Sequence, residues 1–319
     1  MKVSIVAPMY NEEKNLENTY KQVSQELENN GIEDYEIIFV NDGSTDATWE
    51  KAKQLAARVK NLNVIGYEQN QGRGKALRTG FDFATGDVIV SIDFDLSYDT
   101  SHISRMLDEL NRNSSIDVVL TSCYMPGGKT VGVPAFRLFI SKTANLLYRF
   151  AFTPQIYTTT CVVRAYRKHA IKSLDLESND KEIHLEIISK LLANNFRIKE
   201  IPGTLTKRQA GKSNFKFTAH SISHILFFIQ ERPFVLFGII GLLLIFAGFG
   251  AAIILFITRF GDVPGFKQTF ISRISSPNFV IIIFLAAFQI LGLGFLGIQN
   301  NMLKKELFRM QRNIKGLGK

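Results

Sequence analysis

One stretch of the chain reads Val88-Ile89-Val90-Ser91-Ile92-Asp93-Phe94-Asp95-Leu96-Ser97, a β-branched apolar run that ends in two carboxylates. A run of this kind is typical of a buried strand. If the strand geometry continues to Asp95, Asp93 and Asp95 point to one face and Phe94 points back into the protein. Two carboxylates on one face repel each other unless a cation lies between them. One interpretation is therefore a Mg²⁺ or Mn²⁺ site, and the other is a strand end with two solvated acids.

The composition limits the class of protein. A chain of 319 residues with 46% hydrophobic content can bury a sizeable core and still carry a smaller module. Its two cysteines, Cys123 and Cys161, provide no disulfide framework, which favours a reducing compartment. The first apolar run is too short for a signal peptide and is typical of a strand. The formal charge of +9 indicates an anionic partner: phosphates, nucleic acid or an acidic membrane surface.

Strand and helix patterns alternate through the first half of the chain. They predict strands at 3–7, 35–40, 63–66, 87–92 and 117–121, and helices at 12–28, 47–59, 74–84 and 101–111. This alternation favours an α/β fold with a mostly parallel sheet covered on both faces. Ligands of such sheets bind at the carboxyl ends of the strands. Residues 8–12, Asp42, Asp93 and Asp95 all fall at those ends.

Several motifs of the chain resemble those of a known protein family. The chain resembles the family 2 glycosyltransferases of the GT-A fold at Pro8-Met9-Tyr10-Asn11-Glu12, Val40-Asn41-Asp42-Gly43-Ser44-Thr45-Asp46, Asn70-x-Gly72-x-Gly74-Lys75-x-Leu77-Arg78-x-Gly80 and Asp93-x-Asp95. It resembles the dolichol-phosphate mannose synthase branch at Thr160-Cys161-Val162-Val163-Arg164-Ala165-Tyr166-Arg167 and Arg208-Gln209-Ala210-Gly211-Lys212-Ser213. The likeness covers residues 3–216, and the order and spacing of the motifs are more specific than any one of them.

The resemblance implies a set of site residues. The nucleotide would be bound by Pro8, Tyr10, Glu12, Asp42, Lys75 and Asp93. The metal would be bound by Asp93, Asp95 and Ser97, and the acceptor phosphate by Arg137, Ser141 and Lys212. Asp95, Arg137 and Arg208 would act in catalysis.

Each motif also has a plainer interpretation. Asp42 can serve only the bend that follows its strand, because Asp and Gly both favour turns. Residues 72–75 lack the third glycine of a dinucleotide fingerprint. They are as well explained by a solvated helix start as by a phosphate-facing helix N-terminus. Arg137 can be a surface cation of a helix, and Ser141 a small packing residue.

The sequence departs from the resembled family at two positions. Where the family usually carries a polar amide as a further metal ligand, this chain has Ser97, so that a hydroxyl or a bridging water would replace the amide. Where the family carries an arginine, this chain has Cys123, which removes a bidentate phosphate donor.

A basic segment follows the predicted sheet, with cations at Arg197, Lys199, Lys207, Arg208, Lys212 and Lys216. Such charge runs are usually a solvated face. Here Gly211 allows a loop that closes over the diphosphate and the acceptor phosphate. Nucleic acid is disfavoured as a partner, because aromatic residues do not alternate with these cations.

The last third of the chain predicts a membrane anchor. Apolar residues at helical spacing predict an amphipathic interfacial helix at 215–232. Within 233–301, the segments 233–258 and 278–299 are long and apolar enough to span. Close helix approach, and homo-oligomers through these helices, are expected from glycines at 241, 248, 250, 292, 294 and 297. The positive-inside rule predicts that the basic tail at 302–319 is cytoplasmic. Because two spans separate them, a catalytic domain at 1–214 is expected on the same side.

The apolar segments predict a multi-pass cell-membrane protein, and the resemblance implies that it is an inverting glycosyltransferase. As the resemblance implies, it would move mannose or glucose from GDP-mannose or UDP-glucose to a polyprenyl phosphate, dolichyl or undecaprenyl. Two alternatives stay open. The first is a transferase that acts on another acceptor, either another lipid or, as in a processive polysaccharide synthase, a polysaccharide. A processive synthase needs a Q-x-x-R-W element, whereas Trp49 is the only tryptophan of this chain. A non-catalytic membrane scaffold is the other, which Ser97 and Cys123 leave open.

Overall fold

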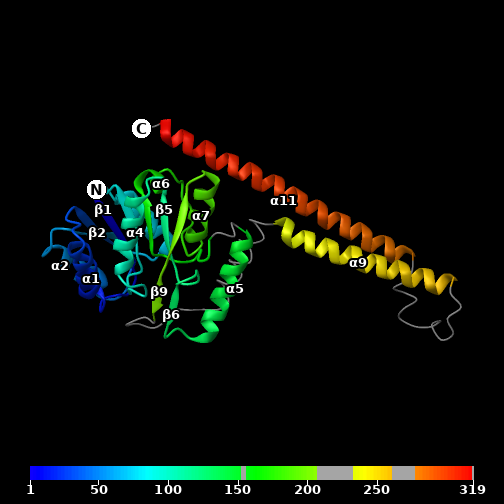
Figure 1. Ribbon diagram of the computed structural model, residues 1–319, viewed down its shortest axis with the longest axis horizontal. Helices are drawn as coiled ribbons and strands as arrows, with labels where there is room; N and C mark the ends of the chain where they lie inside the picture. The colour runs from blue at the N-terminus through cyan, green and yellow to red at the C-terminus, as the bar shows by residue number, and fades with distance from the viewer. Residues whose placement is uncertain (152–155, 207–232, 261–276, 318–319) are drawn as a thin grey trace. The chain divides into compact units, whose positions relative to one another are not determined.

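The computed structural model describes residues 1–151, 156–206, 233–260 and 277–317 (Figure 1). The chain divides into two compact units, Met1–His220 with Lys305–Lys319 and Ser221–Lys304, and each is described by itself. The first unit is built on a seven-stranded sheet with helices on both faces. This architecture confirms the α/β fold class that the alternating patterns predict.

The central sheet has the strand order β3-β2-β1-β4-β7-β5-β8. Its strands are β1 (Val3–Met9), β2 (Tyr35–Asp42), β3 (Leu62–Tyr67), β4 (Val88–Ser91), β5 (Val118–Ser122), β7 (Arg164–Arg167) and β8 (Ile198–Pro202). Neighbouring strands are parallel except where β7 pairs with β4 and β5. The other strands of this sheet therefore end at one common edge.

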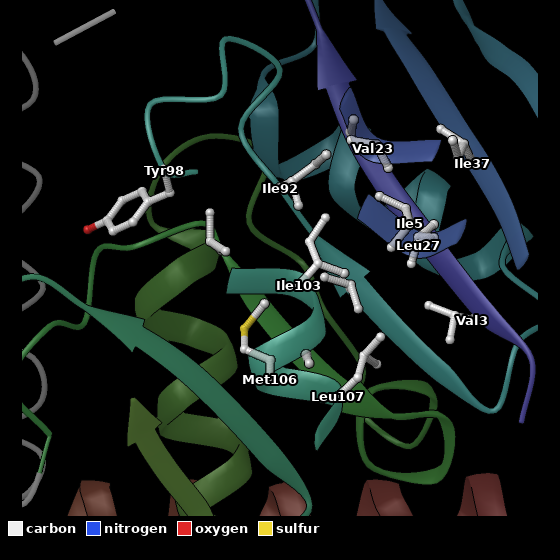
Figure 2. Packing of buried hydrophobic residues seen from close by; sticks show 14 of the residues in the cluster. Val3, Ile5, Val23, Leu27, Ile37, Ile92, Tyr98, Ile103, Met106 and Leu107 are labelled. Carbon is white, nitrogen blue, oxygen red and sulfur yellow. The ribbon is translucent and has the colours of Figure 1, made fainter. Parts of the chain in front are cut away.

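Alternating side chains along the strands fill a separate core on each face of the sheet. One core is covered by α1 (Leu16–Asn29), α2 (Thr48–Ala56) and α4 (Ser101–Arg112), and the other by α3 (Arg73–Phe83), α6 (Lys168–Lys172) and α7 (Ile183–Ala193). Figure 2 shows part of the first core, where Val3 and Ile5 of β1 lie near Val23 and Leu27 of α1. Val6, which follows Ile5 in the sequence, belongs to the second core, as the period-2 geometry of a strand requires.

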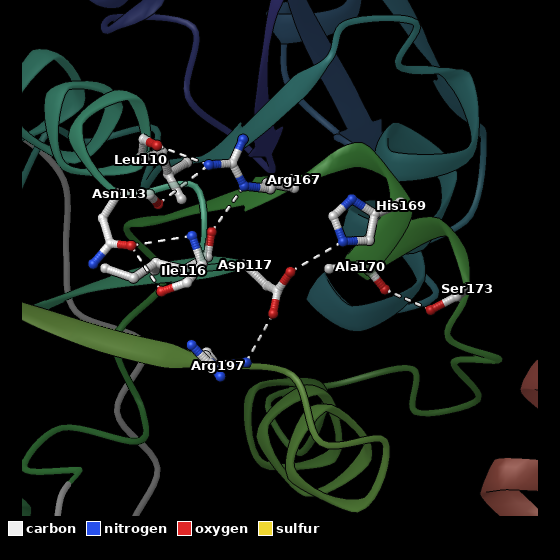
Figure 3. Close-up of polar contacts among 10 residues, drawn as sticks. Leu110, Asn113, Ile116, Asp117, Arg167, His169, Ala170, Ser173 and Arg197 are labelled. Carbon is white, nitrogen blue, oxygen red and sulfur yellow. Dashed lines mark hydrogen bonds and ion pairs between the residues drawn. The ribbon is translucent and has the colours of Figure 1, made fainter.

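The amino ends of β5 and β8 are joined to β7 by polar contacts (Figure 3). Asp117 accepts a hydrogen bond from the Arg197 backbone N–H at 2.9 Å and lies 3.0 Å from His169 Nε2. Arg167 donates to the carbonyl oxygens of Ile116 and Leu110. These contacts lie at the amino ends of the parallel strands. The candidate site residues lie at the opposite edge, where those strands end.

The remaining elements of the first unit lie beyond the carboxyl edge. Strands β6 (Lys129–Val131) and β9 (Thr204–Thr206) form a two-stranded parallel sheet. Helix α5 (Ala135–Ala151) follows β6 and exposes Phe136, Phe139 and Leu146.

The elements expected between residues 3 and 121 are all present, with small shifts at their ends. The strand geometry does not continue to Asp95, however. Strand β4 ends at Ser91, and Leu96 adopts φ 48° in a turn whose Leu96 N–H donates to the Asp93 carbonyl. The antiparallel β7 is a further difference, because alternating strands and helices favour parallel pairing.

The second unit contains α9 (Pro233–Phe260) and the first part of α11 (Pro277–Leu317). Both are long and apolar enough to cross a membrane, over Leu236–Ile257 and Pro277–Gln311. Helix α11 does not end at 299 as expected, but runs on through most of the basic tail. The interfacial helix expected at 215–232 lies outside the described residues.

Some of the predicted glycines bring α9 and α11 together. A Cβ atom at Gly241 would lie 2.7 Å from Leu291, one at Gly248 3.0 Å from Phe284, and one at Gly297 2.3 Å from Pro233. The expectation of close approach is therefore confirmed at these positions. It is wrong for Gly250 and Gly292, where an added Cβ would meet open space.

Helix α3 packs on the sheet through Gly80. A Cβ atom there would lie 2.3 Å from Cγ1 of Val6 on β1 and 3.1 Å from Cγ2 of Val40 on β2. Both neighbours are β-branched and stiff at χ1, so they cannot turn away.

Replacing Gly80 with alanine should therefore destabilise the fold, by about 1–3 kcal/mol from overpacking less about 1 kcal/mol of improved helix propensity. Denaturant unfolding measures the net change. Removing the opposing methyl groups in the double variant Gly80→Ala/Val6→Ala should give a loss smaller than the sum of the single losses. Strict additivity would contradict the contact.

Candidate functional site

The turn after β4 holds the two carboxylates predicted to bind a metal. Phe94 packs back into the first core, and the Asp95 residue is 8% exposed. The Ser97 backbone N–H donates to Asp95 Oδ1 at 3.0 Å, and its hydroxyl also hydrogen-bonds to that oxygen. Asp95 and Ser97 are thus adjacent, as the proposed ligand set requires, although in this structure the hydroxyl is directed to Asp95.

Asp93 lies at the more open side of the same turn. Its side chain is 21% exposed, and Oδ1 lies 3.3 Å from Nη1 of Arg73, at the start of α3. Among the described residues no group of three or more His, Cys, Asp or Glu side chains is placed to hold a metal. Two carboxylates on one turn fit Mg²⁺ or Mn²⁺, because such ions are often held by one or two carboxylates and by substrate phosphates. Asp93 and Asp95 would therefore bind the cation together with oxygen atoms of a ligand.

The loops after β1 and β2 are tied to each other. Asn11 adopts φ 56°, donates its N–H to Ser44 Oγ at 3.0 Å and accepts the Thr45 N–H at 2.8 Å. The next residue, Glu12, donates its N–H to Thr48 Oγ1. These contacts fix the segment that carries Pro8, Tyr10 and Glu12, whose Tyr10 side chain is exposed. Sequence reasoning did not single out Asn11 by itself, although Asn is one of the few residues that tolerates positive φ.

Asp42 binds the loop that precedes α3. Its Oδ1 accepts the backbone N–H groups of Gln71 at 2.9 Å and Gly72 at 3.1 Å, and its Oδ2 accepts the Asn70 amide at 3.0 Å. Burial raises the pKa of Asp42, and these hydrogen bonds offset the shift only in part. These contacts join Asp42 to the loop before α3 and not to the bend that follows β2, so they give no support to the interpretation that Asp42 serves only that bend. Its role toward a nucleotide stays a prediction.

Residues 175–182, which we call the ledge, lie against the start of α3. A Cβ atom at Gly72 would lie 2.3 Å from the Asn179 carbonyl oxygen, and one at Gly74 2.5 Å from that of Ser178. The Lys75 backbone N–H donates to the Asn179 carbonyl at 3.1 Å. The two glycines are thus needed for close packing of the ledge, which explains the motif without a dinucleotide.

A buried ion pair holds the ledge in place. The carboxylate of Glu186 on α7 accepts the backbone N–H groups of Glu177 and Ser178, both at 2.8 Å. Lys190 Nζ lies 2.7 Å from Glu186 Oε1, and it also donates to the Asp175 carbonyl. One carboxylate therefore fixes two consecutive peptide units of the ledge. Neither Glu186 nor Lys190 was expected to matter, because both occur within an ordinary helical pattern.

Arg164 joins the ledge side of the site to the acceptor side. This first residue of β7 is fully buried and donates to the carbonyl oxygens of Cys161 at 2.7 Å, Thr159 at 2.6 Å and His184 at 3.1 Å. The arginine of the motif at 160–167 is consequently a structural residue.

The proposed acceptor residues lie on α5 beside a cavity. Arg137 is exposed and Ser141 half-buried on this helix, and Asn145, further along it, accepts the Thr159 N–H at 2.8 Å. A cavity of about 470 Å³ lies between α5 and the segment after β5, lined by Cys123, Tyr124, Met125, Gly128, Thr130, Lys142, Asn145, Leu146, Arg149 and Tyr157. Lys142 and Arg149 therefore supply cations beside the position where the resembled family has arginine and this chain has Cys123.

Strand β9, which lies within the basic segment, is hydrogen-bonded to the carboxylate turn. The Thr206 N–H and hydroxyl both donate to the Ser97 carbonyl, at 2.8 and 3.0 Å, and Leu205 pairs with Tyr98. Arg208 and Lys212, which follow β9 in the chain, lie outside the described residues.

Sequence comparison finds relatives over the same part of the chain. Residues 4–175 match the family model "Glycosyl transferase family 2". A dolichol-phosphate mannosyltransferase of Pyrococcus furiosus is 33% identical over 68% of this chain and 60% of its own length. A polyprenol monophosphomannose synthase of Mycolicibacterium smegmatis is 31% identical over 71% of this chain and 85% of its own. The chain thus spans somewhat less than two thirds of the first relative and most of the second.

Solved structures share the fold at lower identity. Glucosyl-3-phosphoglycerate synthase of Mycobacterium tuberculosis with Mn²⁺, UDP-glucose and phosphoglyceric acid has a TM-score of 0.55 at 19% identity, covering 72% of this chain and 79% of that one. The same enzyme with Mg²⁺ and UDP gives 0.54 at 20% identity, over 72% and 79%. The likeness supports the GT-A architecture of the first unit.

Replacing Glu186 with glutamine should destabilise the protein by about 3–5 kcal/mol, because it leaves Lys190 buried without its carboxylate. Denaturant unfolding at neutral pH measures the loss. The exposed Glu50→Gln on α2 is a matched control and should change stability by no more than about 0.5 kcal/mol.

The comparison of the native protein with Glu186→Gln also gives a pH test. Burial raises the pKa of Glu186, but hydrogen bonds from Lys190 and Ser178 outweigh it, and the pKa lies below its usual value. The stabilisation is then present above the unfolded pKa and is lost as pH falls through the folded pKa. The difference between the native protein and Glu186→Gln should shrink in acid, and a constant difference would contradict the assignment.

Proposed function

The chain belongs to the family 2 glycosyltransferases, and from this we propose that it transfers a hexose from a nucleoside-diphosphate sugar to a polyprenyl phosphate. The observation that carries the proposal is the Asp93–Asp95 turn with Arg73 beside it, at the edge of the sheet where the β1, β2 and β3 loops meet. The names of the relatives support the acceptor, because both describe the transfer of mannose to a dolichol or polyprenol phosphate. Mannose is therefore the favoured hexose, and glucose is the alternative.

On the donor side, Tyr10, Glu12, Asp42 and Lys75 would bind the nucleotide, with Pro8 shaping the end of β1. Asp93 and Asp95 would hold the metal, with Ser97 as a further oxygen. A bound Mg²⁺ or Mn²⁺ would supply positive charge for the leaving diphosphate. Arg73, already 3.3 Å from Asp93, would add a second positive charge at the same place.

On the acceptor side, Arg137, Ser141 and Lys212 would bind the lipid phosphate, and Arg208 would orient it. An oxygen of that phosphate attacks the anomeric carbon while the bond from this carbon to the diphosphate breaks. A single displacement inverts the configuration, and the nucleoside diphosphate leaves with the electron pair. The attacking phosphate is already an anion, so the protein needs to position it rather than deprotonate it.

The second unit would present the lipid acceptor. We place α9 and α11 across the cell membrane, with residues 1–214 on the cytoplasmic side, where the basic tail favours them. The apolar side chains that α5 exposes, Phe136, Phe139 and Leu146, would contact lipid. Gly250 and Gly292 leave helix surface open where a second copy of the chain could pack.

The proposal predicts sugar transfer from GDP-mannose or UDP-glucose to a polyprenyl phosphate, measured as radiolabel extracted into organic solvent. Asp95→Asn should reduce transfer by at least about a hundredfold, because the weaker amide ligand replaces a carboxylate at the metal. The amide oxygen can still accept from Ser97, so the fold should persist, which thermal unfolding checks. Transfer by Asp95→Asn at the native rate would remove the metal assignment, and absence of transfer by the native chain with every donor and lipid would favour a scaffold.

Arg137→Ala should raise the apparent KM for polyprenyl phosphate, or lower kcat, by roughly ten- to hundredfold, since losing a charge-assisted hydrogen bond costs about 1.5–3 kcal/mol. Nucleotide affinity by calorimetry should be nearly unchanged. Arg137→Lys should recover only part of the loss, because lysine lacks the bidentate geometry.

The exposed Arg112→Ala on α4 removes the same charge elsewhere and should behave as the native chain. If Arg137→Ala instead abolishes nucleotide binding and leaves the dependence on lipid unchanged, Arg137 belongs to the donor side.

A further inference from the structure

The ledge brings a lysine to the edge of the sheet that carries the carboxylate turn. Lys181 follows Ser178 and Asn179, whose carbonyl oxygens contact Gly72 and Gly74 on either side of Arg73. Arg73 in turn pairs with Asp93. The chain thus brings Lys181 close to the start of α3 and to the residues proposed to face the diphosphate, although Lys181 is 108 residues from Arg73 and 88 residues from Asp93 in the sequence.

The surroundings of Lys181 contain other cations. Its side chain is partly buried, and its pKa is lowered by burial, by Arg73 and by Arg137, while Asp180 and Glu182 act in the opposite direction. The positive charges of Arg73 and Lys181 also reach His184, a fully buried histidine whose Nε2 has no hydrogen-bond partner among the described residues. Cations that converge in this way repel one another, and an anion bound between them removes that cost.

The backbone just before Lys181 is fixed by several hydrogen bonds. The Glu186 carboxylate fixes the peptide units of Glu177 and Ser178, and the Lys75 N–H fixes the carbonyl of Asn179. The Arg78 guanidinium also donates to the Leu176 carbonyl at 2.7 Å. The backbone that carries Lys181 is therefore held in place before a ligand binds, which is a feature of an electrostatically preorganised site.

We infer that Lys181 is a catalytic residue that contacts the diphosphate of the donor on the side facing the acceptor phosphate. This inference rests on the proposed function. After burial, the charges of Arg73, which is proposed for the donor side, and Arg137, which is proposed for the acceptor side, both lower the pKa of Lys181. A compact ammonium charge between two phosphate groups lowers the repulsion that opposes their approach, and it stabilises charge that develops on the leaving group.

The test compares nucleotide binding by the full chain, with Mg²⁺ present, using GDP, GMP, UDP and UMP as probes. Lys181→Met should weaken binding of the diphosphate that the native chain prefers by roughly tenfold or more, the value of one charged hydrogen bond. The affinity for the matching monophosphate should change less, so that the ratio of the two affinities falls. Lys181→Arg should restore most of the diphosphate binding, and kcat should fall in Lys181→Met even at saturating donor.

Lys21→Met, an exposed lysine of α1, removes the same charge and should behave as the native chain. Equal diphosphate affinity in Lys181→Met and the native chain would overturn the inference while leaving the proposed function intact. An equal loss of monophosphate and diphosphate binding would also overturn it, because it would indicate a displaced ledge rather than a lost contact. If the native chain binds neither diphosphate and transfers no sugar, the proposed function fails and the inference fails with it.

Discussion

The buried guanidinium of Arg164 joins the parts of this fold that would otherwise be independent loops. The guanidinium donates to carbonyl oxygens of the segment before β7 and to the carbonyl oxygen of His184 at the start of α7. One side chain therefore holds that segment and α7 together. A charge in a protein core is costly unless its donors are satisfied, and here three carbonyl groups satisfy it. Arg164 occupies this position because it is the first residue of β7, the antiparallel strand that lies between β4 and β5.

From that support the site is assembled by loops that bind one another. The β1 loop binds the β2 loop through Asn11, the β2 end binds the β3 loop through Asp42, and the ledge closes on α3. In the first two cases a polar side chain of one loop forms hydrogen bonds with backbone groups of the neighbouring loop. Asp93 and Asp95, the carboxylates proposed to bind a metal, lie on a turn that is itself held by the hydrogen bonds from Ser97 to Asp95.

Much of this arrangement could be predicted from the sequence, because local patterns determine it. Alternating apolar residues specify the strands from β1 to β5, and each strand end specifies where a motif such as Asp93-x-Asp95 must lie. Lys181, Glu186 and Arg164 could not be found in this way, because their roles depend on contacts between distant segments. The turn at Asp95 escaped prediction for another reason: Leu96 adopts a positive φ that its side chain does not favour.

The two hydrogen bonds from Thr206 to the Ser97 carbonyl give the carboxylate turn a mechanical link to β9. A ligand that displaced the turn would therefore also pull on Thr206, the last residue of β9. The carboxylate turn and the end of β9 would therefore move together rather than independently.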